Sequence, residues 1–251
     1  MTSAAGALLD GPLARVLFLH AHPDDETLST GGLIATLAAS GVECLVVTCT
    51  RGERGEVIPG VLPPDAGIDE LVGLRHLELA GACTDLGVTR HAYLGTPPAL
   101  APGRSPRVYR DSGMRWVTPT LAGPSLDAGP ETLTGAPLVD AVADCAAVIA
   151  AWTPDVVVSY DQGGGYGHPD HVRTAAIALA ASRESGVPLV QVVTGAPEDA
   201  VWVDVSGALD RVRRALGRYA SQLSVHDDHV VHVGGQHQPI DTRVGLRRVA
   251  R

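Results

Sequence analysis

The sequence contains no lysine and no asparagine, so all 19 of its basic residues are arginine. Without lysine, the protein is neither a Schiff-base enzyme nor a Walker-type phosphate binder, and it has no Ser–Lys catalytic dyad. Without asparagine, it has no N-glycosylation site. The formal net charge of −9 opposes duplex binding through phosphate neutralisation, so we expect no nucleic-acid partner.

Cysteines are few, and Cys44, Cys49, Cys83 and Cys145 form no CxxC pair. Most lie in apolar runs, which is typical of buried free thiols in a reducing compartment. No run approaches the roughly 20 apolar residues that a membrane-spanning helix needs. The first residues also lack the basic start and apolar stretch of a secretion signal. We therefore expect a cytoplasmic protein with no membrane partner.

The 251 residues, of which 45% are apolar, can bury a sizeable core in one large domain. Short Val/Leu-rich runs alternate with helical patterns, which predicts a Rossmann-like α/β fold with a mainly parallel sheet and helices on both faces. The predicted strands are 15–20, 42–49, 88–94, 155–160 and 189–193, and the predicted helices are 27–40, 69–83, 138–152, 171–185 and 206–223. The alternating tail over 229–249 predicts a C-terminal β-hairpin.

The segment 95–135 interrupts this rhythm, because it is rich in proline and glycine and has little periodicity. A loop of this length in a compact domain is usually functional or disordered. We expect an ordered, irregular insertion that walls an active site, within a single domain spanning residues 1–251.

Two segments that directly follow predicted strands carry unusual chemistry. The first is HAHPDDE at 20–26 and the second is DQGGGYGHPDH at 161–171. In open parallel sheets, ligands bind at the carboxyl ends of the strands. A His-Pro-Asp sequence is also a good helix start in its own right. That alternative does not explain why two histidines and two aspartates occur at each of two strand ends.

Imidazole and carboxylate donors suit a divalent transition metal, and catalytic zinc sites combine three protein ligands with one open position. His22 and Asp25 lie three residues apart across a proline turn, and His171 comes from the other strand end. We predict that these three side chains bind one Zn²⁺ per chain, with Fe²⁺ or another divalent transition metal as the alternative.

Four further residues of these segments have predicted catalytic roles. Asp24 lies beside the predicted ligands without being needed as one, so it is the candidate general base for a water molecule. His168 is expected to be protonated and to stabilise or protonate the reacting group. Asp170 is expected to orient a histidine ligand, and Tyr166 to offer its hydroxyl to a developing oxyanion.

Four motifs together carry a resemblance to a known family: HPDDE, VTCTRGERGEV at 47–57, YRDSGM at 109–114 and GGYGHPDH. The chain resembles the PIG-L/LmbE-like zinc-dependent N-deacetylases over roughly residues 14–250. It is most similar to the branch with the mycothiol-biosynthesis N-acetylglucosaminyl-inositol deacetylase and the mycothiol conjugate amidase. The resemblance implies the same three ligands, and catalytic roles for Asp24, His168 and Tyr166. It also implies substrate contacts from Arg75, Asp111 and Met114.

The expected activity is removal of an N-acetyl group from a small molecule that contains N-acetylglucosamine, either a mycothiol precursor or a natural-product glycoside. One alternative is a mycothiol S-conjugate amidase, which uses the same chemistry on a larger substrate. An alternative of another class is a non-catalytic sugar-binding protein on the same fold, which would have no use for Asp24. The separate His/Asp cluster at 226–232 is expected to be a turn leading into the terminal hairpin.

Overall fold

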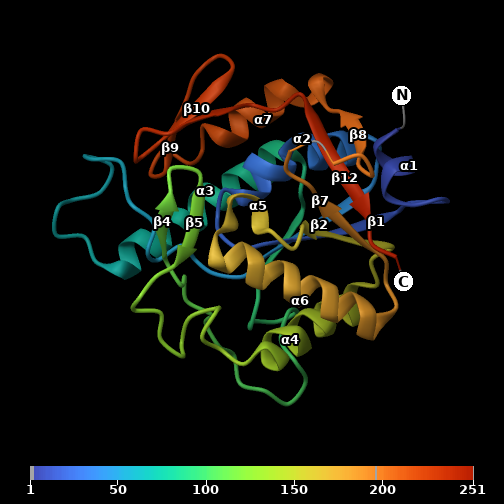
Figure 1. Cartoon of the computed structure of the whole chain (residues 1–251), viewed down its shortest axis with the longest axis horizontal. Coiled ribbons are helices and arrows are strands. Elements are labelled where there is room, and N and C mark those ends of the chain that lie inside the picture. The colour runs from blue at the N-terminus through green and yellow to red at the C-terminus, as the bar shows by residue number, and fades with distance from the viewer. Residues whose placement is uncertain (1–2, 196, 251) are drawn as a thin grey trace.

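The central sheet is mainly parallel and draws strands from both halves of the chain (Figure 1). The computed structural model describes residues 3–195 and 197–250, and within them seven strands form one sheet in the order β3-β2-β1-β6-β7-β12-β8. These strands are β1 (Arg15–His20), β2 (Glu43–Thr48), β3 (Arg90–Tyr93), β6 (Val156–Tyr160), β7 (Leu189–Val192), β8 (Val201–Asp204) and β12 (Arg243–Arg248). Neighbouring strands from β3 to β7 are parallel, whereas β12 is antiparallel to β7 and β8. The predicted α/β class is confirmed.

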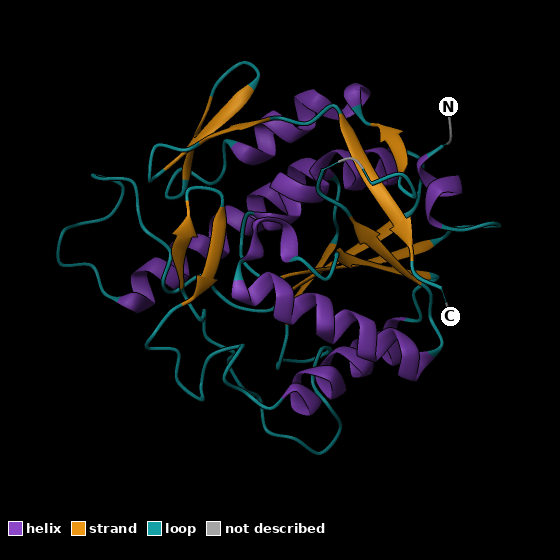
Figure 2. Ribbon diagram, in the orientation of Figure 1, coloured by secondary structure: helices purple, strands orange, loops and turns teal. Residues whose placement is uncertain are grey.

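Helices cover both faces of this sheet (Figure 2). One face carries α2 (Asp25–Ala39), α3 (Ile68–Leu86) and α7 (Leu209–Leu216), and the other carries α4 (Leu138–Trp152) and α6 (Pro169–Ser185). Val16 and Phe18 of β1 pack on the first face, and Leu17 and Leu19 pack on the second. Because both faces are buried, the strand is a continuous apolar run rather than an alternating one. None of the helices in the described ranges has the length and apolarity needed to cross a membrane.

The predicted helix over 206–223 is too long. The structure has a short 3₁₀ turn, η1 (Ser206–Ala208), followed by α7, which ends at Leu216. Gly217 follows as the cap, and residues 217–222 form turns before β9 (Leu223–Val225). The short helix α1 (Ala4–Leu8) and the edge strand β8 were not predicted. Both are brief elements whose apolar residues are too few to set a period.

The C-terminal antiparallel strands are present, but they are divided between two sheets. β10 (His229–His232) and β11 (His237–Pro239) form a hairpin that pairs with β9, whereas β12 joins the central sheet. His226 N–H donates to His229 O at 2.8 Å, so the 226–229 segment is a tight turn, as predicted. Within the described ranges, this His/Asp cluster contains no set of three donor atoms close enough to hold one metal ion.

The 95–135 segment is ordered and contains a β-hairpin that was not predicted, β4 (Met114–Thr118) with β5 (Leu121–Pro124). Its anchor is Asp144 of α4, a fully buried carboxylate. Asp144 accepts hydrogen bonds from Tyr109 OH at 2.7 Å and from Ala101 N–H at 2.8 Å. A carboxylate with two buried donors fixes the path of this otherwise irregular chain against the helix.

Replacing this anchor should destabilise the protein. Asp144→Ala leaves the Tyr109 hydroxyl and the Ala101 N–H buried without an acceptor, so we expect the free energy of unfolding to fall by about 2–4 kcal/mol. Denaturant unfolding measures the loss, and limited proteolysis should place new cleavage within 95–135. The control is Asp140→Ala on the same helix, which removes a partly exposed partner of Arg107. Equal losses in the two variants would contradict the anchoring role of Asp144.

Candidate metal centre

The two motif-bearing loops meet because the strands that precede them are parallel neighbours. β1 pairs with β6 in the register Val16↔Val156 to Phe18↔Val158, so the carboxyl ends of both strands lie at one edge of the sheet. After β1, the chain turns through residues 21–24 into α2. After β6, it passes through the short helix α5 (Gly164–Gly167) into α6. His168 Nδ1 accepts the N–H of Asp170 at 3.2 Å, which caps α6 directly before Pro169.

The three predicted ligands converge at this edge. The carboxylate of Asp25 lies between the two imidazoles: Oδ2 is 3.1 Å from His22 Nδ1, and Oδ1 is 3.2 Å from His171 Nε2. The centroids of the two rings are 5.3 Å apart. His20, the other histidine of the first motif, is fully buried with its Nε2 2.9 Å from the Thr30 hydroxyl, so it belongs to the core.

Unpaired buried atoms support a cation at this place. His171 Nε2 has no hydrogen-bond partner within the described residues despite its short distance to Asp25, and Asp170 Oδ1 has none either. Native structures rarely leave such atoms unpaired unless an ion or water satisfies them. Burial lowers the pKa of His22, but the charges of Asp111, Asp170 and Asp25 outweigh it and hold that pKa well above its usual range. The surplus of buried negative charge therefore fits a bound metal ion.

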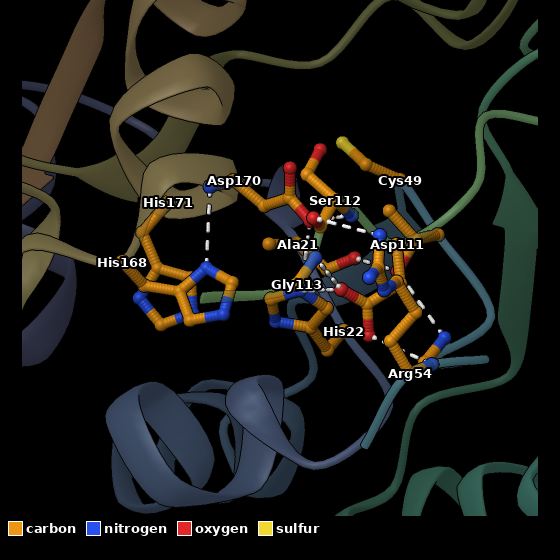
Figure 3. Close-up of polar contacts among 12 residues, drawn as sticks. Ala21, His22, Cys49, Arg54, Asp111, Ser112, Gly113, His168, Asp170 and His171 are labelled. Atoms are coloured by element: carbon orange, nitrogen blue, oxygen red, sulfur yellow. Dashed lines mark hydrogen bonds and ion pairs between the residues drawn. The ribbon is translucent and has the colours of Figure 1, made fainter. Parts of the chain in front are cut away.

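Among the described residues, two donor sets have all their atoms within 4.8 Å of one another, His22–His168–His171 and His22–Asp111–Asp170, and neither contains Asp25. Asp25 approaches the two predicted histidine ligands with different oxygens, Oδ2 for His22 and Oδ1 for His171. Both ring nitrogens of His22 face carboxylates: Nε2 lies 3.2 Å from Asp170 Oδ2 (Figure 3), and Nδ1 lies 3.1 Å from Asp25 Oδ2. If a metal ion replaced the proton on Nδ1, Nε2 would keep its proton and donate it to Asp170, because a carboxylate only accepts. Asp111 and Asp170 lie on the Nε2 side of the ring, away from Nδ1.

Asp170, the predicted orienting residue, lies within hydrogen-bond distance of His22. It is completely buried, and its Oδ2 also accepts the N–H of Ser112 at 2.9 Å (Figure 3). This bond ties the 95–135 segment to the start of α6. Asp170 therefore fixes both the imidazole of His22 and the wall beside it.

His168 differs from the expectation of a charged side chain. Burial, together with the neighbouring His22 and His171, lowers the pKa of His168 to about 2. Its Nδ1 accepts a backbone N–H, so the proton of the neutral ring is on Nε2. Burial of the ring disfavours the expected protonated form more than the nearby carboxylates favour it. What remains available is a neutral N–H donor.

Asp24 has an unusual backbone. Its φ of 116° lies where non-glycine residues are rarely found and where the conformation costs energy. Its N–H donates to Glu26 Oε2 at 3.1 Å. Burial and the negative charges of Asp25 and Glu26 hold the pKa of the Asp24 carboxyl well above its usual range. A raised proton affinity beside the metal centre is what a general base requires.

Glu26 is the residue of this site that sequence reasoning missed. It is fully buried and accepts hydrogen bonds from Tyr219 OH and Thr27 OH as well as from the Asp24 backbone. Tyr219 comes from the turn after α7, from which Gln222 Nε2 also donates to Pro23 O at 2.8 Å. In the sequence, Glu26 has the pattern of an ordinary acidic residue in a first helical turn, and its partner is 193 positions away.

The predicted substrate contacts have different surroundings. Asp111 is buried, with Oδ1 3.8 Å from His22 Nε2. Arg75 is only 2% exposed, and its guanidinium donates to Gly52 O and to Glu56 O, so it holds the loop after β2. Met114 is half-buried at the start of β4. Tyr166 is 42% exposed, and its ring centroid is 5.3 Å from that of His171. The substrate-contact roles stay predictions.

Fold and site together define the class of protein: an α/β protein with a candidate metal centre at the carboxyl edge of its parallel sheet. Residues 17–182 match the family model PIG-L, described as GlcNAc-PI de-N-acetylase. The chain belongs to this family, and the resemblance drawn from its motifs is confirmed.

Relatives of known name extend this finding. A 1D-myo-inositol 2-acetamido-2-deoxy-α-D-glucopyranoside deacetylase of Actinosynnema mirum is 46% identical over 175 residues, which are 69% of this chain and 56% of that protein. The protein of the same name from Streptomyces scabiei is 37% identical over 246 residues, 88% of this chain and 71% of its own length. The chain thus spans little more than half of the first relative.

A solved structure shows the same fold. The zinc-inhibited form of teicoplanin deacetylase Orf2 superimposes with a TM-score of 0.57 at 24% identity, covering 82% of this chain and 84% of that one.

Replacing Glu26, which accepts the backbone N–H of Asp24, should lower the stability of the turn between β1 and α2. In Glu26→Gln, an amide NH₂ replaces one carboxylate oxygen and cannot accept from Tyr219 OH or the Asp24 N–H. We expect a loss of about 1–3 kcal/mol in the free energy of unfolding, measured by denaturant titration. The control, Glu184→Gln, changes an exposed side chain on α6. If both variants unfold at the same denaturant concentration as the wild type, Glu26 does not support the loop.

Proposed function

We propose that this protein is a zinc-dependent N-deacetylase, an amidohydrolase that removes the acetyl group from an N-acetylglucosamine unit joined to inositol or a similar small polyol. Family membership and the names of the relatives support the reaction and the substrate class. The observation that carries the proposal is the convergence of His22, Asp25 and His171, with an unpaired buried nitrogen on His171 and a separate carboxylate, Asp24, beside them.

The reaction breaks the C–N bond of the acetamide and adds water across it. A bound divalent metal would polarise the amide carbonyl and lower the pKa of water, which is the chemistry that the His/Asp ligand set suits. Asp24 accepts the proton of the attacking water as the new C–O bond forms. Its raised pKa makes it able to hold that proton and then return it.

The remaining side chains position the groups and stabilise charge. Asp170 fixes the ring of His22 through Nε2 and so keeps Nδ1 directed at the metal position. The neutral His168 offers Nε2–H to the developing oxyanion or to the leaving nitrogen, and Tyr166 offers its hydroxyl on the open side. The amine leaves with the proton taken from water, and acetate is the other product.

The base assignment has a direct test. Asp24→Asn should bind zinc like the wild type and release acetate at least about 100-fold more slowly, since general-base catalysis contributes that much or more. Calorimetric zinc titration and an assay of free amine on N-acetylglucosaminyl-inositol measure the two properties. Asp65→Asn, at an exposed position, is the matched control. Turnover by Asp24→Asn at the wild-type rate would exclude Asp24 as the base.

The metal assignment is tested separately. Chelation should abolish acetate release, and His171→Ala should lose both metal binding and activity. Zn²⁺ and Fe²⁺ are added back one equivalent at a time, because the teicoplanin deacetylase Orf2 has a zinc-inhibited form and an excess of the metal could mask activity. Undiminished hydrolysis by the chelated protein would contradict a metal-dependent mechanism.

A substrate panel separates the proposed activity from its alternatives. N-acetylglucosaminyl-inositol, free N-acetylglucosamine and a cysteine-containing mycothiol conjugate are compared for amine release. We expect the first to be preferred. Preference for the conjugate would identify an amidase, and binding without hydrolysis of any substrate would identify a sugar-binding protein.

A further inference from the structure

The β4–β5 hairpin packs directly against the short helix α5, which contains Tyr166 (Figure 1). Gly167 has a φ of 84°, and a Cβ added to it would lie 2.8 Å from Leu121 Cδ1 and 3.1 Å from Ala122 O. A side chain at position 167 would therefore collide with β5, so the contact between α5 and the hairpin is close at this point.

Aromatic rings continue from the metal centre onto this hairpin. The Tyr166 ring lies 5.3 Å from that of His171 and 6.0 Å from that of His168, both edge-on. On its other side, the ring of Trp116 in β4 lies 5.8 Å from Tyr166 at an angle of 31°. Trp116 therefore packs against Tyr166, and the ring of Tyr166 in turn lies beside the predicted ligand His171.

Both aromatic side chains are open to solvent: Trp116 is 44% exposed and Tyr166 is 42% exposed. Large aromatic residues left half-exposed next to a site commonly bind ligand. Strand register adds Met114, because Met114 pairs with Pro124 and Trp116 pairs with Ala122, which places Met114 and Trp116 on the same face of the hairpin. Val117 lies on the opposite face, where it contacts the Cβ position of Gly123.

Polar groups border the same approach to the centre. Arg54 donates its backbone N–H to Asp111 Oδ2 (Figure 3). Its guanidinium pairs with Asp127, which follows β5. A polyol ring has an apolar C–H face and a rim of hydroxyl groups. Such a ring can pack its apolar face on an indole and hydrogen-bond its hydroxyl groups to carboxylate and guanidinium groups. An acyl chain needs no polar partners, so this surface suits a polyol ring better.

We propose that Trp116, next to the already predicted substrate contact Met114, packs against the polyol ring attached to the N-acetylglucosamine unit, and so determines which conjugate the enzyme prefers. The ring packs its C–H face on the indole while the acetamide lies at the metal centre. The proposal rests on the proposed deacetylase activity and names the residue that selects the conjugate. Trp116 acts on substrate binding and has no part in the proton transfers.

The test compares a substrate with the polyol ring and a substrate without it. For N-acetylglucosaminyl-inositol, Trp116→Ala should raise KM about tenfold with little change in kcat, since one aromatic packing contact is worth about that much. For free N-acetylglucosamine, the same variant should match the wild type. Trp116→Phe should recover part of the loss, and Val117→Ala on the opposite face is the matched control.

Binding of the product tests the proposed Trp116 subsite independently of catalysis. Glucosaminyl-inositol, the deacetylated product, is titrated while intrinsic tryptophan fluorescence is recorded. The wild type should show a saturable change that Trp116→Phe lacks, because Trp152 is buried and only Trp202 remains as another exposed indole. Equal losses on both substrates, no loss on either, or a fluorescence change retained in Trp116→Phe would overturn the subsite. If the wild type hydrolyses nothing, the proposed activity fails, and the fluorescence titration still decides the subsite.

Discussion

The parallel pairing of β1 with β6 is the constraint on which the rest of the site depends. It places the carboxyl ends of two distant strands at one edge of the sheet, so His22 and Asp25 meet His171 although the loops are far apart in sequence. The same edge holds the first turns of α2 and α6. Helix starts favour negative charge, which helps a small volume hold several carboxylates.

Burial makes that concentration of charge costly, and the surrounding structure offsets the cost with hydrogen bonds. Asp170 accepts from Ser112 and His22, and Glu26 accepts from Tyr219 and the strained Asp24 backbone. These contacts come from the 95–135 segment and from the turn after α7. Two peripheral segments with weak sequence patterns thus maintain the geometry of the two motif loops.

The candidate metal centre and the proposed polyol subsite are located on different parts of the molecule. The predicted ligands and base lie in the turn after β1 and in the first turns of α2 and α6, whereas Met114 and Trp116 lie on a hairpin that packs against α5 and α6. Within the described residues, β4 and β5 form a sheet of their own, so a substitution at Met114 or Trp116 alters no strand of the central sheet.

The sequence by itself determined the α/β class, the parallel strands, most helices and the convergence of His22, Asp25 and His171. These features follow from local periodicity and from motifs placed at strand ends, which need no knowledge of distant contacts. Only the tertiary structure decided that α7 ends at Leu216, that β12 joins the central sheet, that burial lowers the pKa of His168 and that Glu26 accepts from the Asp24 backbone. Each of these depends on burial or on a partner far along the chain, and the local pattern of residues contains neither.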